Sequence, residues 1–284
     1  MTSRPCLQGL IVLAAALAFL GFAAPPAHAS VFTWDGGGGN GLWATVNNWD
    51  VGGSDPVTPP TSADTASFAG TAPGTVTGSG TMSVGVIQFS ASGYTISGGT
   101  LALGGTAPQI QQTAAVSGTN TISSAITSTA ALSVDVQAGQ LNLNGLINAA
   151  GAVNLTKSGA GTLSLGIAQT YTGTTTISGG TLAVGTTNAI NSAGGTTIVN
   201  AGGTLSIGPG ILQVLSGKAS GGNPYTSLTM NGGTVSGAGT LSISAAGGND
   251  PSITSTGGGL ISVATLNIGG VSGETAAKNI TISI

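Results

Sequence analysis

The sequence predicts an all-β protein, a β-solenoid with coils of about 20 residues. Glycine supplies 51 of the 284 residues, charged residues only 4% and aromatic residues 4%, whereas 40% are hydrophobic. That balance argues against a disordered chain, and the shortage of large side chains argues against a compact enzyme core. A Gly-led run of alternating polar and apolar residues returns about every 20 positions, which is typical of stacked β-coils.

Residues 1–29 are predicted to be a secretory signal peptide. Arg4 supplies a positive charge, residues 10–24 form an apolar run, and Ala27-His28-Ala29 has the small-x-small pattern that signal peptidase cleaves. We expect cleavage between Ala29 and Ser30. A retained membrane anchor is the alternative, but it needs about 20 apolar residues. The expected product is an exported protein without an integral membrane segment.

Cleavage would change the chemistry that is available to the chain. It removes Cys6, His28 and Arg4, which are the sole cysteine, histidine and arginine. Three lysines then face seven acidic residues, a net charge of −4. Nucleophilic triads need a histidine base, zinc sites draw on His and Cys, and nucleic acid needs clustered cations. The composition therefore predicts a non-catalytic protein with no cofactor, no zinc site and no nucleic-acid partner.

Residues 30–70 form a Trp- and Gly-rich segment that is predicted to cap the N-terminal end of the solenoid. Large aromatic side chains at such an end cover the open apolar column and block edge pairing. Trp34, Trp43 and Trp49 are the candidates for this role. The alternative is that the three rings form a platform on which sugars stack, which makes them the candidate sugar-binding residues.

The same segment carries oxygen-bearing side chains that could bind Ca²⁺. Asp50, Asp55 and Asp64 lie near Asn47 and Asn48. Their spacing is not that of an EF-hand, and Asp or Asn beside Gly and Pro usually forms turns. Turn formation is the favoured interpretation, and calcium binding stays open.

Residues 71–284 carry the repeats and are predicted to form the solenoid. The Gly that begins each run recurs with a near-constant step from Gly80 to Gly203, and the longer step that follows, to Gly239, implies an insertion or two short coils. A β-sandwich would explain the alternation but not the near-constant step. The side chains expected to lie inside, in one column, are those of Met82, Leu101, Leu141, Leu163, Leu182, Leu205 and Leu241; those expected outside are Thr81, Thr100, Thr162, Thr181, Thr204 and Thr240.

Residues 155–184, LTKSGAGTLSLGIAQTYTGTTTISGGTLAV, carry a longer motif. The segment resembles the autotransporter-associated β-strand repeat of bacterial exported proteins at Leu155, Lys157, Gly159, Gly161, Thr162, Leu163, Leu165, Tyr171, Gly173, Thr175, Ile177, Gly180, Thr181 and Leu182. The Trp-rich start resembles the segment that precedes such repeats. The resemblance implies a right-handed β-helical passenger or stalk that a C-terminal barrel exports. We expect no such barrel within this sequence, since no aromatic residue follows Tyr225.

The predicted function is an exported structural or adhesive surface module of a Gram-negative-type bacterium. Its expected partners are cell-surface or matrix glycans or proteins, and the chain could also associate end to end. A carbohydrate-binding or carbohydrate-cleaving β-helix is the alternative, but Asp135 and Asp250 should lie roughly 28 Å apart along the axis, too far for a catalytic pair. An ice- or mineral-binding face is a third hypothesis, suggested by Thr172, Thr174 and Thr176.

Overall fold

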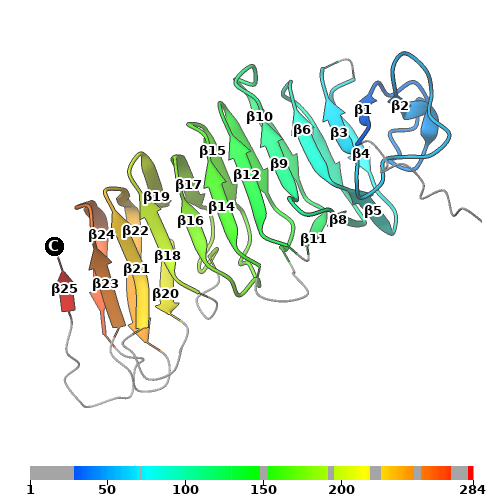
Figure 1. The fold of residues 1–284 in the computed structure, drawn as a ribbon. Coiled ribbons are helices and arrows are strands. Elements are labelled where there is room, and N and C mark those ends of the chain that lie inside the picture. The colour runs from blue at the N-terminus through cyan, green and yellow to red at the C-terminus, as the bar shows by residue number, and fades with distance from the viewer. Residues whose placement is uncertain are drawn as a thin grey trace, which may run out of the picture.

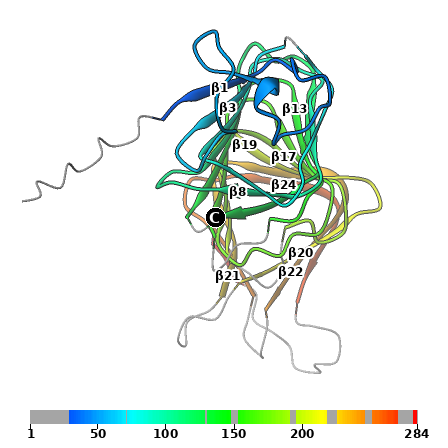
Figure 2. The same cartoon turned by 90° about the vertical axis from the view of Figure 1, so that its right-hand side faces the viewer.

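The computed structural model describes residues 29–70, 72–128, 130–147, 153–190, 195–217, 225–245, 251–269 and 281–283. The chain winds into a parallel β-solenoid whose coils stack along one axis, from the blue N-terminal end to the red C-terminal end in Figure 1. Figure 2 looks down the axis of the solenoid, so that the coils lie one behind another around a common interior. The predicted signal peptide, apart from Ala29, lies outside the described residues.

Sheet A is the longest face of the solenoid. All its neighbouring strands are parallel except β2, which is antiparallel to β1. In spatial order it contains β2 (Trp49–Asp50), β1 (Val31–Trp34), β3 (Thr65–Phe68), β6 (Val86–Phe89), β9 (Gln109–Gln112), β12 (Leu132–Val136), β14 (Leu155–Ser158), β16 (Thr175–Ile177), β18 (Thr197–Asn200), β21 (Tyr225–Asn231), β23 (Pro251–Ser255) and β25 (Thr281–Ser283).

Two further sheets complete the coils. Sheet B contains β4 (Thr75–Thr77), β7 (Thr95–Ser97), β10 (Thr119–Ile122), β13 (Gln140–Leu143), β15 (Thr162–Leu165), β17 (Gly180–Val184), β19 (Gly203–Ile207) and β22 (Thr234–Ala245), and β22 also pairs with β20 (Leu212–Gly217) and β24 (Leu260–Ile268). Sheet C contains β5 (Thr81–Val84), β8 (Thr100–Leu103) and β11 (Ala125–Ser128). One 3₁₀ turn, η1 (Val46–Asn48), lies in the N-terminal segment.

The coils are slightly longer than the sequence predicts. Successive register partners along sheet A, from β3 to β18, are Ala66, Ile87, Ile110, Val134, Lys157, Ile177 and Val199. The next step, from Ile198 to Thr229, is longer than these because β20 is inserted there. Of the two alternatives that the sequence leaves open after Gly203, the structure has one coil with an insertion. The residues that pair with Thr204–Ser206 are Thr234–Ser236 rather than the run after Gly239.

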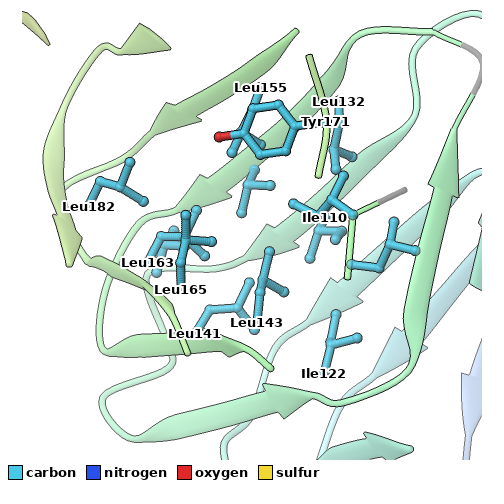
Figure 3. Packing of buried hydrophobic residues seen from close by; sticks show 14 of the residues in the cluster. Ile110, Ile122, Leu132, Leu141, Leu143, Leu155, Leu163, Leu165, Tyr171 and Leu182 are labelled. Carbon is cyan, nitrogen blue, oxygen red and sulfur yellow. The ribbon is translucent and has the colours of Figure 1, made fainter. Parts of the chain in front are cut away.

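Alternation along each strand places one set of side chains in the interior. The seven residues predicted to point inward are all buried, with 0–2% of their surface exposed. Figure 3 shows labelled side chains such as Leu141, Leu163 and Leu182 meeting inside the coils. Their Thr neighbours predicted outside are exposed or partly exposed. Burial of this kind stabilises each side chain by roughly 1.5–3 kcal/mol, which a single coil could not achieve without its neighbours.

The prediction of one continuous column was wrong, however. Leu141, Leu163, Leu182 and Leu205 do stack in register in sheet B. Met82 and Leu101 stack on each other in sheet C. Leu241 pairs with Gln213 in the part of β22 that contacts β20. The physical reason is that a Gly-Thr-Leu run suits any flat face of a coil, so the same short pattern recurs on two different faces.

Glycine at the coil corners has two distinct roles. Gly180 has φ of +60°, a conformation that L-residues avoid, and a Cβ there would collide with the carbonyl oxygen of Gly159 in the coil below. Gly161 is not among the glycines with positive φ, but a Cβ would lie only 2.9 Å from the carbonyl oxygen of Gly139. Close approach between coils, as well as left-handed backbone, therefore explains the glycine at the start of each run.

Aromatic side chains fill the interior at the N-terminal end. Trp49 contacts Trp34 and Trp43 edge to face, with centroids 5.0 and 4.8 Å apart. Phe68 continues the cluster and stacks on Phe89 at 5.2 Å. β1 and β3 belong to sheet A and pair in parallel, as do β3 and β6, so the Trp-rich segment contributes two strands to the start of the solenoid.

Candidate binding surface

The outer side of sheet B carries a regular array of hydroxyl groups. Thr162, Thr181, Thr204 and Thr234 are register partners in four successive coils. Two residues further along the strands, the second row contains Ser164, Ser206 and Ser236, with Ala183 between the first two. We call these two rows the hydroxyl face. Backbone pairing sets a spacing of about 4.8 Å along a row, and the two rows lie about 6.6 Å apart.

The hydroxyl face is uncharged and accessible. Its Thr and Ser residues are partly exposed. Within the described part of the chain, the side chains of Thr162, Thr181 and Thr204 donate no hydrogen bond to another residue. A hydroxyl is both a donor and an acceptor, so each one can bind a polar ligand in either sense. Thr also suits this position because β-branched residues favour strands.

One row on the outer side of sheet A differs because its polar groups bond to one another. Gln88, Gln111, Asp135 and Ser158 are successive register partners. The Gln88 Nε2 donates to Gln111 Oε1 at 2.8 Å, and the Ser158 hydroxyl donates to Asp135 Oδ1 at 3.0 Å. These groups support the stacking of coils, and fewer of them are left for a ligand.

The three tryptophans proposed for sugar stacking do come together, but they lie inside the molecule. Trp34, Trp43 and Trp49 are 2%, 3% and 0% exposed. The Trp49 indole N–H donates to the carbonyl oxygen of Trp43 at 2.8 Å, so its polar atom is also satisfied internally. No ring presents a face on which a sugar could stack. The three rings pack on one another in the apolar interior, and a sugar could reach them only if this packing opened.

The acidic residues of the N-terminal segment organise turns. Asp35 Oδ1 accepts from the Gly37 N–H at 2.9 Å, and Asp50 Oδ1 accepts from the Gly53 N–H at 2.8 Å. Asp55 accepts from the Asn47 side chain. The described residues contain no group of three His, Cys, Asp or Glu side chains placed to hold a metal ion. The contacts that these oxygens make are those of Asx turns and loop closure.

The carboxylates considered for catalysis are only partly described. Asp135 accepts from Ser158 Oγ in the neighbouring strand β14 and from Gln137 Nε2 just after β12. Asp250 and Glu274 lie outside the described residues. Beside Trp43, Pro59 and Met82 there is a pocket of about 180 Å³, which is below the roughly 300 Å³ of ordinary ligand sites.

The Thr172–Thr176 run does not extend into a row. Thr176 has Thr156 as its partner on one side but Ile198 on the other. The Thr-x-Thr pattern therefore ends within two coils.

Lys157 has a structural environment rather than a catalytic one. Its side chain points inward from β14 and is fully buried. The Nζ donates to the carbonyl oxygens of Ser158, Gly159 and Gly179 at 2.6, 2.9 and 3.1 Å, and so joins two successive coils. Burial lowers the pKa of Lys157 to about 8, and the nearby Asp135 carboxylate opposes part of this shift. The amine is still largely protonated at pH 7 and can donate to all three carbonyls.

Buried amides are the internal polar residues that the sequence pattern did not reveal. Asn120 occupies the register position of Leu141 and is fully buried. It accepts from the Tyr94 N–H at 2.9 Å and donates to the Ala91 carbonyl and to Gln112 Oε1. Gln169 and Gln213 likewise bond to backbone groups in the interior. The one signal in the sequence was Asn120 itself, which stands after Gly118 and Thr119 where most other runs have Leu.

Comparison with known proteins bears directly on this arrangement. Residues 155–184 match the family described as passenger-associated-transport-repeat. The matched segment is thus similar to that repeat. Within the fold it runs from β14 to β17 and includes Lys157, Leu163 and Tyr171, which are buried. The buried positions explain much of the motif, because they hold two consecutive coils together.

A curated relative carries a functional name. The adhesin BmaC autotransporter of Brucella suis biovar 1 (strain 1330) is 37% identical over 179 residues, which cover 59% of this chain and 4% of that protein. The chain thus spans a small fraction of the relative it matches. No solved structure matches the chain. The two sequence matches place the chain with exported, passenger-type repeat proteins of the Gram-negative cell surface. Within the described residues, no helix is both long and apolar enough to span a membrane.

Proposed function

We propose that the chain is a non-catalytic adhesive module and that the hydroxyl face is its contact surface. The observation that carries the proposal is the register of Thr162, Thr181, Thr204 and Thr234 in consecutive coils. The similarity to an autotransporter adhesin supports the adhesive role. The two polar rows have no charge, so they suit a neutral, repetitive partner rather than a polyanion.

The partner class that fits best is a neutral glycan of a cell surface or matrix. Sugars present many hydroxyl groups, and each can exchange a hydrogen bond with a Thr or Ser hydroxyl. A single such bond contributes little in water, on the order of 0.5–1.5 kcal/mol. Repetition along the rod converts weak contacts into useful avidity because each later contact forms within an already bound complex.

The test compares two faces of the same solenoid. Thr181→Val with Thr204→Val removes two neighbouring hydroxyls of the hydroxyl face and keeps the β-branched shape. Thr156→Val with Thr176→Val does the same on sheet A, where this pair is also in register. Binding of the purified protein, displayed on beads, is measured on intact cells with and without glycosidase treatment.

The sheet B variant should lose most cell binding, whereas the sheet A variant should keep it. Glycosidase treatment should abolish binding of the unchanged protein. Equal binding by all three proteins would refute the assignment to this face. Binding that survives glycosidase treatment but not the sheet B substitutions would indicate a protein partner and overturn the glycan assignment. Turnover of a glycan by the unchanged protein would overturn the non-catalytic proposal.

A further inference from the structure

The first residue of the expected mature chain is held by a buried carboxylate. The backbone N–H of Ser30 donates to Asp64 Oδ1 at 3.0 Å, and the Thr65 N–H donates to the Ser30 carbonyl oxygen at 2.9 Å. Asp64 is only 7% exposed, and its Oδ2 accepts from both the N–H and the hydroxyl of Thr61, at 2.8 and 2.6 Å. Both carboxylate oxygens are therefore directed at fixed donors, and one of those donors is the nitrogen of Ser30.

This nitrogen is also the atom that signal peptidase would release. The Ala27-His28-Ala29 pattern predicts hydrolysis of the bond between Ala29 and Ser30. In that reaction water adds across the peptide bond: the Ala29 carbonyl carbon takes the hydroxyl, and the Ser30 nitrogen takes the proton. The new amine then binds a further proton from solvent below its ordinary pKa of about 7.7–8.0. A neutral amide N–H would become an α-ammonium group beside Asp64.

We propose that cleavage after Ala29 creates an ion pair between the Ser30 α-ammonium and the Asp64 carboxylate, and that this pair locks the first coil. The proposal rests on the predicted signal peptide and is independent of the adhesive function. A hydrogen bond between charged groups is roughly twice as strong as one between neutral groups. Asp64 forms no ion pair with a lysine within the described residues, so the new ammonium is the cation that its position suits.

The ion pair would stabilise the N-terminal end of the solenoid because of where it lies. Ser30 directly precedes β1, and β1 joins the antiparallel β2 to the parallel β3. Trp34 at the end of β1 packs on Trp49 in β2. In Figure 1 these strands lie together at the blue end of the rod. The precursor keeps only the amide hydrogen bond, so its first coil is held less firmly until the leader is removed.

The experiment uses the full solenoid in two chemical forms that differ at one nitrogen. One form begins with a free Ser30 amine, produced by a protease that leaves no extra residue. The other is the same chain with an acetyl group on that nitrogen, which restores the neutral amide of the precursor. Both forms are also made with Asp64→Asn and, as a matched control, with Asp50→Asn, whose carboxylate accepts from a turn N–H in the same segment. Thermal unfolding is followed by tryptophan fluorescence at pH 6.

The free-amine form should unfold several degrees higher than the acetylated form, and the gap should persist with Asp50→Asn but vanish with Asp64→Asn. Equal unfolding temperatures of the free-amine and acetylated forms of the unsubstituted chain would by themselves overturn the proposal. A gap that survives Asp64→Asn would also overturn it. Mass spectrometry of the exported protein must give Ser30 as the first residue, and a different N-terminus would refute the cleavage on which the ion pair depends.

Discussion

Replacing Leu163 by Ala probes the stacking of coils most directly. Leu163 is fully buried and lies between Leu141 and Leu182 in adjacent strands of sheet B (Figure 3). The substitution removes three carbon atoms, and at about 0.8 kcal/mol for each buried methylene the transfer loss is roughly 2.4 kcal/mol. Strands above and below restrain the backbone, so part of the space stays as a cavity and raises the loss to about 3–4 kcal/mol.

The matched control is Thr162→Ala, one residue earlier on the same strand with its side chain on the outer surface. It should change the free energy of unfolding by no more than about 0.5–1 kcal/mol. Urea unfolding followed by far-UV circular dichroism measures both variants. Equal losses for the two, or a loss for Leu163→Ala no larger than that expected of the control, would refute the assignment of inward and outward positions in this strand.

Three further predictions concern polar groups in the interior. The stability of the unchanged protein should rise between pH 8 and 10.5, because the lowered pKa of Lys157 means that the unfolded state binds this proton more tightly than the folded state. Lys157→Met should abolish that rise, and urea midpoints measured across this pH range test the prediction. Burial raises the pKa of Tyr171 to about 12, so the stability of the unchanged protein should fall as the pH rises from 10 towards 12. In thermal unfolding at alkaline pH, Tyr171→Phe should remove this fall. At pH 7 the same substitution should cost about 1 kcal/mol, because the hydrogen bond with Thr175 is lost. Asn120→Leu restores the repeat pattern but removes the hydrogen-bond partner of the Tyr94 N–H and of Gln112 Oε1. The free energy of unfolding, measured by urea titration, should therefore fall by about 1–3 kcal/mol. A gain in stability would contradict the role of these hydrogen bonds.

Local pattern was sufficient to predict the inward direction of the seven apolar side chains and the outward direction of their Thr neighbours. The alternation in Thr162–Leu165 and the near-regular step from one Gly to the next both reflect constraints within one coil, and burial of Leu163 and Leu165 agrees with them. The face on which a run lies depends instead on contacts between residues that are a whole coil apart in the chain. For that reason Leu101 was placed in the wrong ladder although its burial was predicted.

The candidate binding surface was predictable only in part. The outward direction of Thr162 and Thr181 follows from alternation, but their alignment with Thr234 needs the insertion containing β20 to be located in space. Burial of Trp43 and Trp49 follows from mutual packing across η1, which no local pattern encodes. Internal amides such as Gln213 bond to backbone atoms of residues in other coils, so composition alone could not reveal them.

Near-identical register from coil to coil has an evolutionary consequence. Since each coil contacts only its neighbours, a recombination event within two similar Gly-Thr-Leu segments could delete or duplicate a whole coil and still leave well-matched surfaces at the junction. The β15, β17 and β19 strands meet this condition, because each offers Thr and Leu in the same register, directly after a Gly. Length could then vary among descendants of one gene without a new core having to be designed, while the spacing of the outward hydroxyls stayed constant.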